Sequence, residues 1–138
     1  MNYLDATQEA GKNFVQRGIE GPVVMLNLLR FRKVADYTDF PSLDPGEAIS
    51  GKDAYQLYMK HTLPFLQEAG GEVVFYGKGG SFLIGPEAEQ WDLVLLVRHQ
   101  STAAFLAFAT NEGYLAIAGH RKAALSDSRL LPIEENRQ

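Results

Sequence analysis

The stretch from Gly21 to Arg32 constrains the fold of this chain more than any other. At the two-residue period of a strand, one face carries Val23, Met25, Asn27, Leu29 and Phe31, and the other Val24, Leu26, Leu28, Arg30 and Arg32. Because both faces are mainly apolar, such a strand must be covered on both sides. Asn27, Arg30 and Arg32 are costly to bury unless they find hydrogen-bond partners.

A second stretch, from Trp91 to His99, has the same two-sided pattern. One face carries Trp91, Leu93, Leu95 and Val97, and the other carries Val94 and Leu96. Shorter strands are predicted at 72–76, at 81–84 after a glycine-rich turn or bulge, and at 128–132, where Pro132 suits the edge of a sheet.

Helical spacing marks the segments between these strands. Residues 1–20 are expected to form an accessory helix that starts near Asp5 and stops at Gly18. Ser50 begins a longer helix that ends at a double glycine, and Pro64 must kink or divide it.

Two further segments complete the chain. Ser101 or Thr102 begins a helix that the glycine at 113 interrupts and that resumes over 114–125. The connection from Lys33 to Ile49 is either a solvated loop or a lid over a binding site.

After the N-terminal helix, the predicted order is strand, helix, strand, strand, helix, strand. This order is typical of the ferredoxin-like split βαβ arrangement, an α+β fold with both helices on one face of a four-stranded antiparallel sheet. We expect residues 21–133 to form this single domain, with 134–138 as a disordered tail. Since two helices cover one face only, the second apolar face predicts a homodimer of sheets packed face to face, a dimeric α/β barrel.

Composition excludes several classes of protein. The 138 residues include no cysteine, so disulfides, thiolate metal sites and cysteine nucleophiles are absent. The net charge of −4 argues against nucleic acid and against an anionic membrane as partners. No apolar run approaches the about 20 residues of a membrane-spanning helix, and the first residues lack a secretory pattern. We expect a cytoplasmic protein.

The sequence predicts no metal and no cofactor. The three histidines, His61, His99 and His120, come from separate elements and show no metal-ligand spacing. The chain contains no phosphate-binding loop and no dinucleotide fingerprint.

Several pieces of the chain have the order and spacing of a known family. They are residues 25–31 with their asparagine and arginine, 50–58, the double glycine before Glu72, Trp91-Asp92, and Tyr114 followed by 121–125 and 127–129. Through these pieces the chain resembles domain-of-unknown-function family 1330, in the dimeric α/β barrel superfamily related to the antibiotic-biosynthesis monooxygenases. The resemblance covers most of the chain from Gly21 to Pro132 and implies the dimeric barrel. The superfamily includes cofactor-free oxygenases, isomerases, haem enzymes and ligand-binding proteins, so it implies no single activity.

Asn27, Tyr58 and His61 are the candidate catalytic residues. An amide in mid-strand can hydrogen-bond a ligand carbonyl or an oxyanion, or it can be satisfied by neighbouring backbone or water. Tyr58 and His61 are three residues apart on the predicted helix, and such a pair can relay a proton near neutral pH. The alternative for His61 is a structural histidine.

The candidate ligand-binding residues are Arg30, Tyr76, Trp91, Phe105, Tyr114 and Arg121. Arg30 can clamp a carboxylate, or it can pair with an acid such as Asp92. Trp91 and Phe105 wall or fill the space between sheet and helices. Tyr114 and Arg121 share a helix face, and either close a cavity or serve as a core tyrosine with a snorkelling arginine.

Two functions are compatible with these residues. One is a dimeric barrel that binds a small aromatic or carboxylated metabolite between sheet and helices. The other is a cofactor-independent enzyme of the monooxygenase or isomerase type, in which Asn27 stabilises an oxyanion and Tyr58 or His61 moves the proton. The enzyme requires Asn27, Tyr58 and His61 to converge on one cavity.

Overall fold

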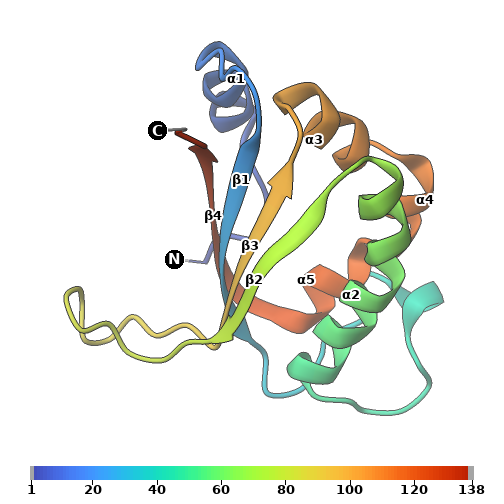
Figure 1. The fold of residues 1–138 in the computed structure, drawn as a ribbon. Helices are drawn as coiled ribbons and strands as arrows, with labels where there is room; N and C mark the ends of the chain where they lie inside the picture. Colours follow the sequence, from blue (N-terminus) through green and yellow to red (C-terminus); the bar gives the residue numbers. More distant parts are fainter. Residues whose placement is uncertain (1, 137–138) are drawn as a thin grey trace.

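A four-stranded antiparallel sheet organises residues 2–136, the part of the chain that the computed structural model describes (Figure 1). The strands lie in the order β2 (Glu72–Lys78), β3 (Leu93–His99), β1 (Val23–Phe31) and β4 (Leu125–Glu134). This is the strand order of the split βαβ arrangement, so the predicted ferredoxin-like α+β fold is confirmed. Pro132 lies in the edge strand β4, where its missing N–H does not interrupt the sheet.

The helices after β1 gather on one face of the sheet (Figure 1). They are α2 (Gly51–Glu68), α3 (Thr102–Ala109), α4 (Glu112–Ile117) and α5 (Gly119–Ala124). Helix α1 (Gln8–Gln16) lies at the end of the sheet where β1 begins, and a short 3-10 helix, η1 (Pro41–Leu43), interrupts the long connection. Within residues 2–136, no helix has the length and apolar character needed to cross a membrane.

Hydroxyl side chains cap the helices much as the sequence predicts. Ser50 Oγ accepts a hydrogen bond from the backbone N–H of Asp53 at 3.0 Å and so begins α2. Thr7, rather than Asp5, caps α1 in the same way. Helix α2 continues through Pro64, which therefore does not divide it.

Strand β1 turns its odd-numbered face toward the helices. Val23, Met25 and Leu29 on this face are at most 2% exposed, and Leu29 packs with Tyr55 in the core. Asn27 lies half-buried on the same face. The periodicity of the strand leaves open which face looks inward, and the structure decides it.

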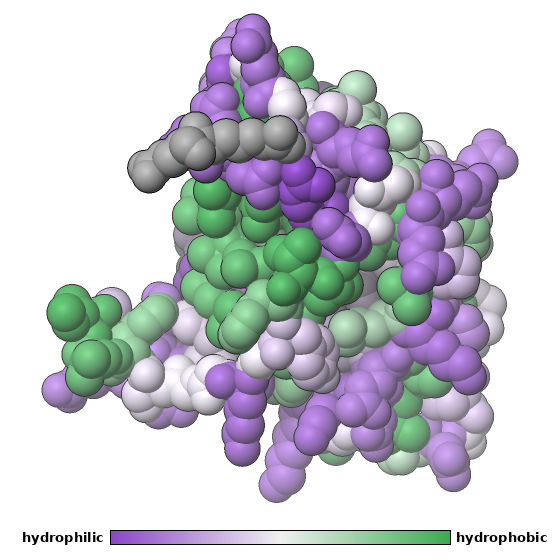
Figure 2. Space-filling model, viewed as in Figure 1, coloured by the Kyte–Doolittle hydropathy of each residue, from purple (hydrophilic) through white to green (hydrophobic). Residues whose placement is uncertain are grey.

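The opposite side of the sheet carries no helix, and we call it the open face. Its apolar residues are Val24, Leu26, Leu28, Phe75, Val94, Leu96, Leu131 and Ile133. The residues of the central strands are half-buried, whereas Phe75 and Leu131 on the edge strands are 53% and 54% exposed. Figure 2 shows an apolar patch on this side of the molecule.

Residues 79–92, which we call the arm, differ from the strand predicted at 81–84. A single bridge between Ser81 and Gln90 joins the two sides of the arm, which projects from the sheet between β2 and β3 (Figure 1). The register shift of β2 falls between Val73 and Phe75 instead of at the glycines. The run 81–84 has the apolar composition of a strand, but no neighbouring strand pairs with it.

The helix predicted at 114–125 also differs. It divides at Ala118 into α4 and α5, and Leu125 already belongs to β4. The break lets the chain turn from the helical layer back into the sheet.

The predicted tail begins later than the sequence indicates. Glu134 is the last residue of β4, and Glu135 accepts hydrogen bonds from the Arg98 guanidinium at 3.2 and 3.1 Å. Disorder is therefore wrong for these two residues, and 137–138 lie outside the described part of the chain.

Candidate functional site

Three tyrosine rings pack in a row where α2 meets α4. The rings of Tyr55 and Tyr58 on α2 have centroids 5.2 Å apart, and the Tyr114 ring of α4 lies 6.2 Å from Tyr58. The hydroxyl oxygens of Tyr58 and Tyr114 are 2.7 Å apart and share a hydrogen bond. Burial raises the pKa of Tyr58 well above its ordinary value, and burial also raises the pKa of Tyr55. Both phenols therefore stay protonated at neutral pH and do not act as bases.

Arg121 of α5 lies beside these tyrosines. Its Nη1 donates to the Leu4 carbonyl oxygen at 2.9 Å, and its Nη2 donates to Ser128 Oγ at 3.3 Å. Burial raises the pKa of Tyr55 and Tyr58, and the Arg121 charge opposes that rise. Among residues 2–136, no Asp or Glu forms a salt bridge with Arg121. A half-buried cation beside phenol donors is suited to binding a carboxylate.

The other two catalytic candidates lie elsewhere. The Asn27 side-chain amide donates to the carbonyl oxygen of Met25 in its own strand at 3.2 Å. His61 is exposed and stacks on His120, with ring centroids 5.7 Å apart. Although Tyr58 and His61 are three residues apart on α2, Tyr58 is buried, and no hydrogen bond in the described part of the chain joins it to Asn27 or His61.

Sequence reasoning missed a buried pair, Tyr37 and His120. The Tyr37 hydroxyl lies 2.7 Å from His120 Nδ1, and the rings meet edge to face at 5.5 Å. Burial and then the nearby Asp44 raise the pKa of Tyr37, whereas burial and then His61 lower the pKa of His120. Both groups are therefore neutral at pH 7.

A signal for the buried pair is present in the sequence. Tyr37, Phe40 and Leu43 recur every three residues within the connection that is predicted to be a solvated loop or a lid. In the structure Tyr37 is in the core and the other two pack against it. This part of the connection is a packed segment.

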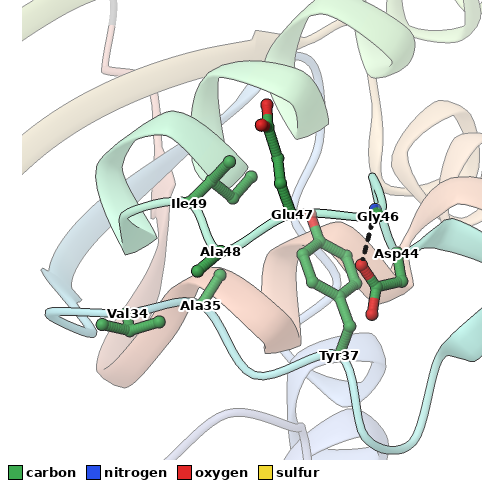
Figure 3. Close-up of a pocket in the computed structure, with 8 residues that line it drawn as sticks. All are labelled: Val34, Ala35, Tyr37, Asp44, Gly46, Glu47, Ala48 and Ile49. Carbon is green, nitrogen blue, oxygen red and sulfur yellow. Dashed lines mark hydrogen bonds between the residues drawn. The ribbon is translucent and has the colours of Figure 1, made fainter.

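A cavity of about 320 Å³ opens beside Tyr37 in the same connection (Figure 3). Its polar lining includes the carboxylates Asp44 and Glu47, and Asp44 Oδ1 accepts a hydrogen bond from Gly46 N at 2.9 Å. Two acids give this cavity the wrong charge for a carboxylated ligand. Residues 2–136 contain no cluster of three or more histidine or acidic side chains that could hold a metal ion.

Arg30 and Trp91 lie on the open-face side of the sheet, away from the tyrosines. The guanidinium carbons of Arg30 and Arg129 lie 5.1 and 4.9 Å from the Trp91 ring centroid. Trp91 is 2% exposed and precedes β3, and it lies against these two arginines instead of walling or filling the space between sheet and helices. Arg30 Nε and Nη2 both donate to the Gln90 carbonyl oxygen, at 3.1 and 3.0 Å, and Arg30 therefore fixes the base of the arm.

A second cavity, of about 300 Å³, lies against these arginines. Its charges balance, because Asp127 pairs with Arg129 at 2.8 Å and with Arg30 at 3.8 Å, and Glu89 lies 3.8 Å from Arg129. Burial opposes the ionisation of Asp127, but hydrogen bonds from the Tyr3 backbone N–H and from Arg129 hold its pKa below the ordinary value. An incoming anion finds no unpaired cation here.

Two ligand-binding candidates remain. Phe105 packs edge-on against Phe14 of α1 and His99 of β3, with centroids 5.8 and 5.0 Å away. Tyr76 lies on the helix side of β2, opposite the buried Leu95 of β3, and is 53% exposed. The structure thus joins Tyr58 to Tyr114, and the charge of Arg121 influences the pKa of Tyr58, while Phe105 fills the space near α1.

Comparison with protein-family models gives no match, and comparison with curated proteins gives none. The resemblance to domain-of-unknown-function family 1330 therefore stays a prediction.

The solved structures do contain similar proteins. The structure of the methylated RPA0582 protein is 35% identical in sequence, with a TM-score of 0.87 over 99% of this chain and 96% of that one. A second structure of RPA0582, described as a protein of unknown function from Rhodopseudomonas palustris, is 33% identical, with a TM-score of 0.86 over all of both chains. A ferredoxin-like protein of unknown function from Jannaschia sp. CCS1, described as dimeric, is 13% identical, with a TM-score of 0.55 over 83% of this chain and 100% of its own. This third likeness concerns the fold alone.

Proposed function

The chain belongs to the same family as the RPA0582 protein of Rhodopseudomonas palustris, and from this premise we propose that it is a homodimer whose subunits each bind a small aromatic carboxylate. The ligand lies between the sheet and the helices, beside Arg121. The half-buried guanidinium of Arg121, which no carboxylate of the described chain neutralises, is the observation that carries the proposal.

Charge selects the site beside Arg121 over the two cavities. The cavity beside Tyr37 is lined by acids, and the cavity beside Arg30 has its arginines paired with Asp127 and Glu89. A carboxylate gains most where a cation is partly removed from water and still lacks an acidic partner.

The surroundings of Arg121 select an aromatic ligand. The Tyr114 ring lies 4.5 Å from Phe108, which extends the row of rings from α2 to α3. Aromatic walls favour a planar ring through edge and offset contacts. Tyr76, half exposed at the edge strand β2 and near enough to Tyr55 to influence its pKa, forms the entrance.

Binding without turnover is the better supported of the two functions. The enzyme requires Asn27, Tyr58 and His61 to act on one substrate, and their hydrogen bonds and ring contacts lead to different neighbours. Burial raises the pKa of Tyr58, so its phenol stays protonated at neutral pH and cannot accept a proton as a general base.

The open face supports self-association. Its apolar residues are neighbours and form one patch, unlike the scattered apolar residues of an ordinary surface. The charged residues around the patch are paired within the subunit, Arg98 with Glu72 and Glu135, and Arg30 with Asp127. A face whose charges are already balanced can meet a copy of itself across a two-fold axis without repulsion. The fold-related Jannaschia protein is described as dimeric.

Thermal-shift measurements with simple aromatic carboxylic acids test the ligand site. We expect the acids, but not the corresponding neutral amides, to raise the melting temperature of the wild-type protein, because a ligand of the native state stabilises it by mass action. Arg121→Gln should lose most of this shift, and Arg121→Lys should keep part of it.

Lys122→Gln is the matched control, because Lys122 is the next residue of α5 and pairs with Asp5 at the surface, 2.7 Å away. It should respond to the acids as the wild type does. An unchanged shift in Arg121→Gln, or no shift of the wild type with any acid, would contradict the proposed ligand site.

A further inference from the structure

We infer that the arm, residues 79–92, packs its tip, Leu83 and Ile84, against the partner subunit of the homodimer. The inference rests on the proposed homodimer and goes beyond it, because packing of two sheets through their open faces does not by itself involve the arm.

The tip of the arm carries the two most exposed large apolar side chains of the described chain. Leu83 is 98% exposed and Ile84 is 92% exposed, and they are adjacent in the sequence. Single exposed apolar residues are common on protein surfaces, but two neighbours this exposed at the end of a projection indicate a contact surface.

The arm is held in place at its base. The Trp91 N–H donates to the Gly80 carbonyl oxygen at 3.1 Å, and the Asp92 N–H donates to the Leu29 carbonyl oxygen of β1 at 2.8 Å. The Asp92 carboxylate accepts from the Phe31 N–H at 2.8 Å, and the Arg30 guanidinium holds the Gln90 carbonyl. These bonds tie the direction of the arm to the central strand of the sheet.

The tip is also structured. Gly85 has a φ of 155°, which residues other than glycine rarely adopt. A methyl group at this position would lie 2.8 Å from the Phe82 ring. The Phe82 ring therefore covers the turn, and Leu83 and Ile84 point outward from it. Such a preformed tip loses little conformational entropy when it binds.

The direction of the arm points to a second copy of this chain as its partner. In Figure 1 the arm projects away from the helices, on the side where the sheet has no cover. Two sheets that pack face to face lie about 10 Å apart, whereas the five residue-to-residue steps from Lys78 to Leu83 can span up to about 18 Å. A subunit seated on the open face therefore comes within reach of the arm.

The charges of the arm argue against a membrane as the partner. Its charged residues are Glu87, Glu89 and Asp92, with no lysine or arginine. Acidic groups next to an apolar tip are repelled by an anionic lipid surface.

Sedimentation of arm variants tests the inference. Because Leu83 and Ile84 make no part of the core, the double variant Leu83→Ser/Ile84→Ser should fold as the wild type does. We expect its dimer dissociation constant to rise about tenfold or more, since it removes two apolar contacts per subunit. Leu115→Ser, which changes a 55% exposed leucine on the helical side, is the control and should leave the constant unchanged within about twofold.

A probe at the tip gives a second readout. The chain has no cysteine, so Leu83→Cys introduces a single thiol for a spin label. We expect the label to be immobilised at concentrations where the protein is dimeric and mobile after dilution to monomer, whereas a label at Leu115→Cys should be mobile in both.

The outcomes separate the two proposals. The role of the arm is overturned if the wild type is a dimer, the double variant has the same dimer dissociation constant, and the label at the tip is mobile. The homodimer would stand in that case. A wild-type monomer overturns the homodimer and the arm contact together.

Discussion

At the scale of single residues, His99 is the buried titratable group that opposes folding most clearly. It is 2% exposed, its ring lies between Phe105 and Phe108 at 5.0 and 5.6 Å, and its Nδ1 has no hydrogen-bond partner within residues 2–136. Burial lowers the pKa of His99 from 6.5 to about 4. Between these two pH values the unfolded chain binds more protons than the folded one, so the free energy of unfolding falls as the pH falls.

This linkage predicts that the free energy of unfolding depends on pH and that replacing His99 makes this dependence weaker. From pH 7 to pH 5, His99 alone should lower the free energy of unfolding by about 2 kcal/mol. Urea unfolding at a fixed protein concentration should show a shallower decrease for His99→Leu. The decrease should remain in part, because burial also lowers the pKa of His120.

The exposed His61 provides the control. His61→Gln should change the pH dependence less than His99→Leu does, since the charge of His61 lowers the pKa of His120 less than burial does. Equal pH dependence in the wild type and in His99→Leu would contradict the assignment.

The sequence predicts single side chains only in part, because their partners come from distant elements. Tyr58 and Tyr114 are both candidates from their helical positions, but the hydrogen bond between them depends on how α2 and α4 pack. The alternation of the sequence predicts that Trp91 shares a strand face with Leu93. In the structure Trp91 lies with Arg30 and Arg129 instead, because the strand begins two residues later. Side-chain partners set by tertiary packing are not encoded in local periodicity.

At the scale of elements, the two faces of strand β1 contribute to different quantities, the stability of one subunit and the stability of the proposed dimer. Leu29 is fully buried under the helices, whereas Leu26 lies half-buried on the open face. The inner leucine belongs to the core of one subunit, and the outer leucine belongs to the proposed interface.

Alanine at these two positions should therefore give different defects. Leu29→Ala should lower the free energy of unfolding by about 2–5 kcal/mol, because it leaves a cavity in the core. Leu26→Ala should lower it less and should mainly raise the dimer dissociation constant. Urea unfolding and sedimentation measure the two effects, and a Leu26→Ala protein that dimerises as the wild type does would argue against an interface on the open face.

Elements with strong periodicity and clear end signals are predictable from this sequence. Ser50 and the double glycine at 70–71 bound α2 as expected, and the alternation of 23–31 gives β1. The arm is not predictable in this way, because residues 81–84 have the composition of a strand but lack a pairing strand. The division at Ala118 is also missed, since no local signal marks where the helical layer turns back into the sheet.

At the scale of the whole molecule, the sheet has helices on one face and an apolar surface on the other. The order of elements predicts the fold, and the two-sided strands predict that something covers the open face. The ligand site is less predictable, because Arg121 becomes distinctive only once the fold has shown that no Asp or Glu of the described residues forms a salt bridge with it.

The contact of the arm requires the homodimer, whereas the ligand site lies in each subunit, so the mass of the particle in solution decides the most. Sedimentation equilibrium of the purified chain at micromolar concentration measures this mass. We expect twice the 15.3 kDa of one chain, and a mass of 15.3 kDa under these conditions would exclude the homodimer.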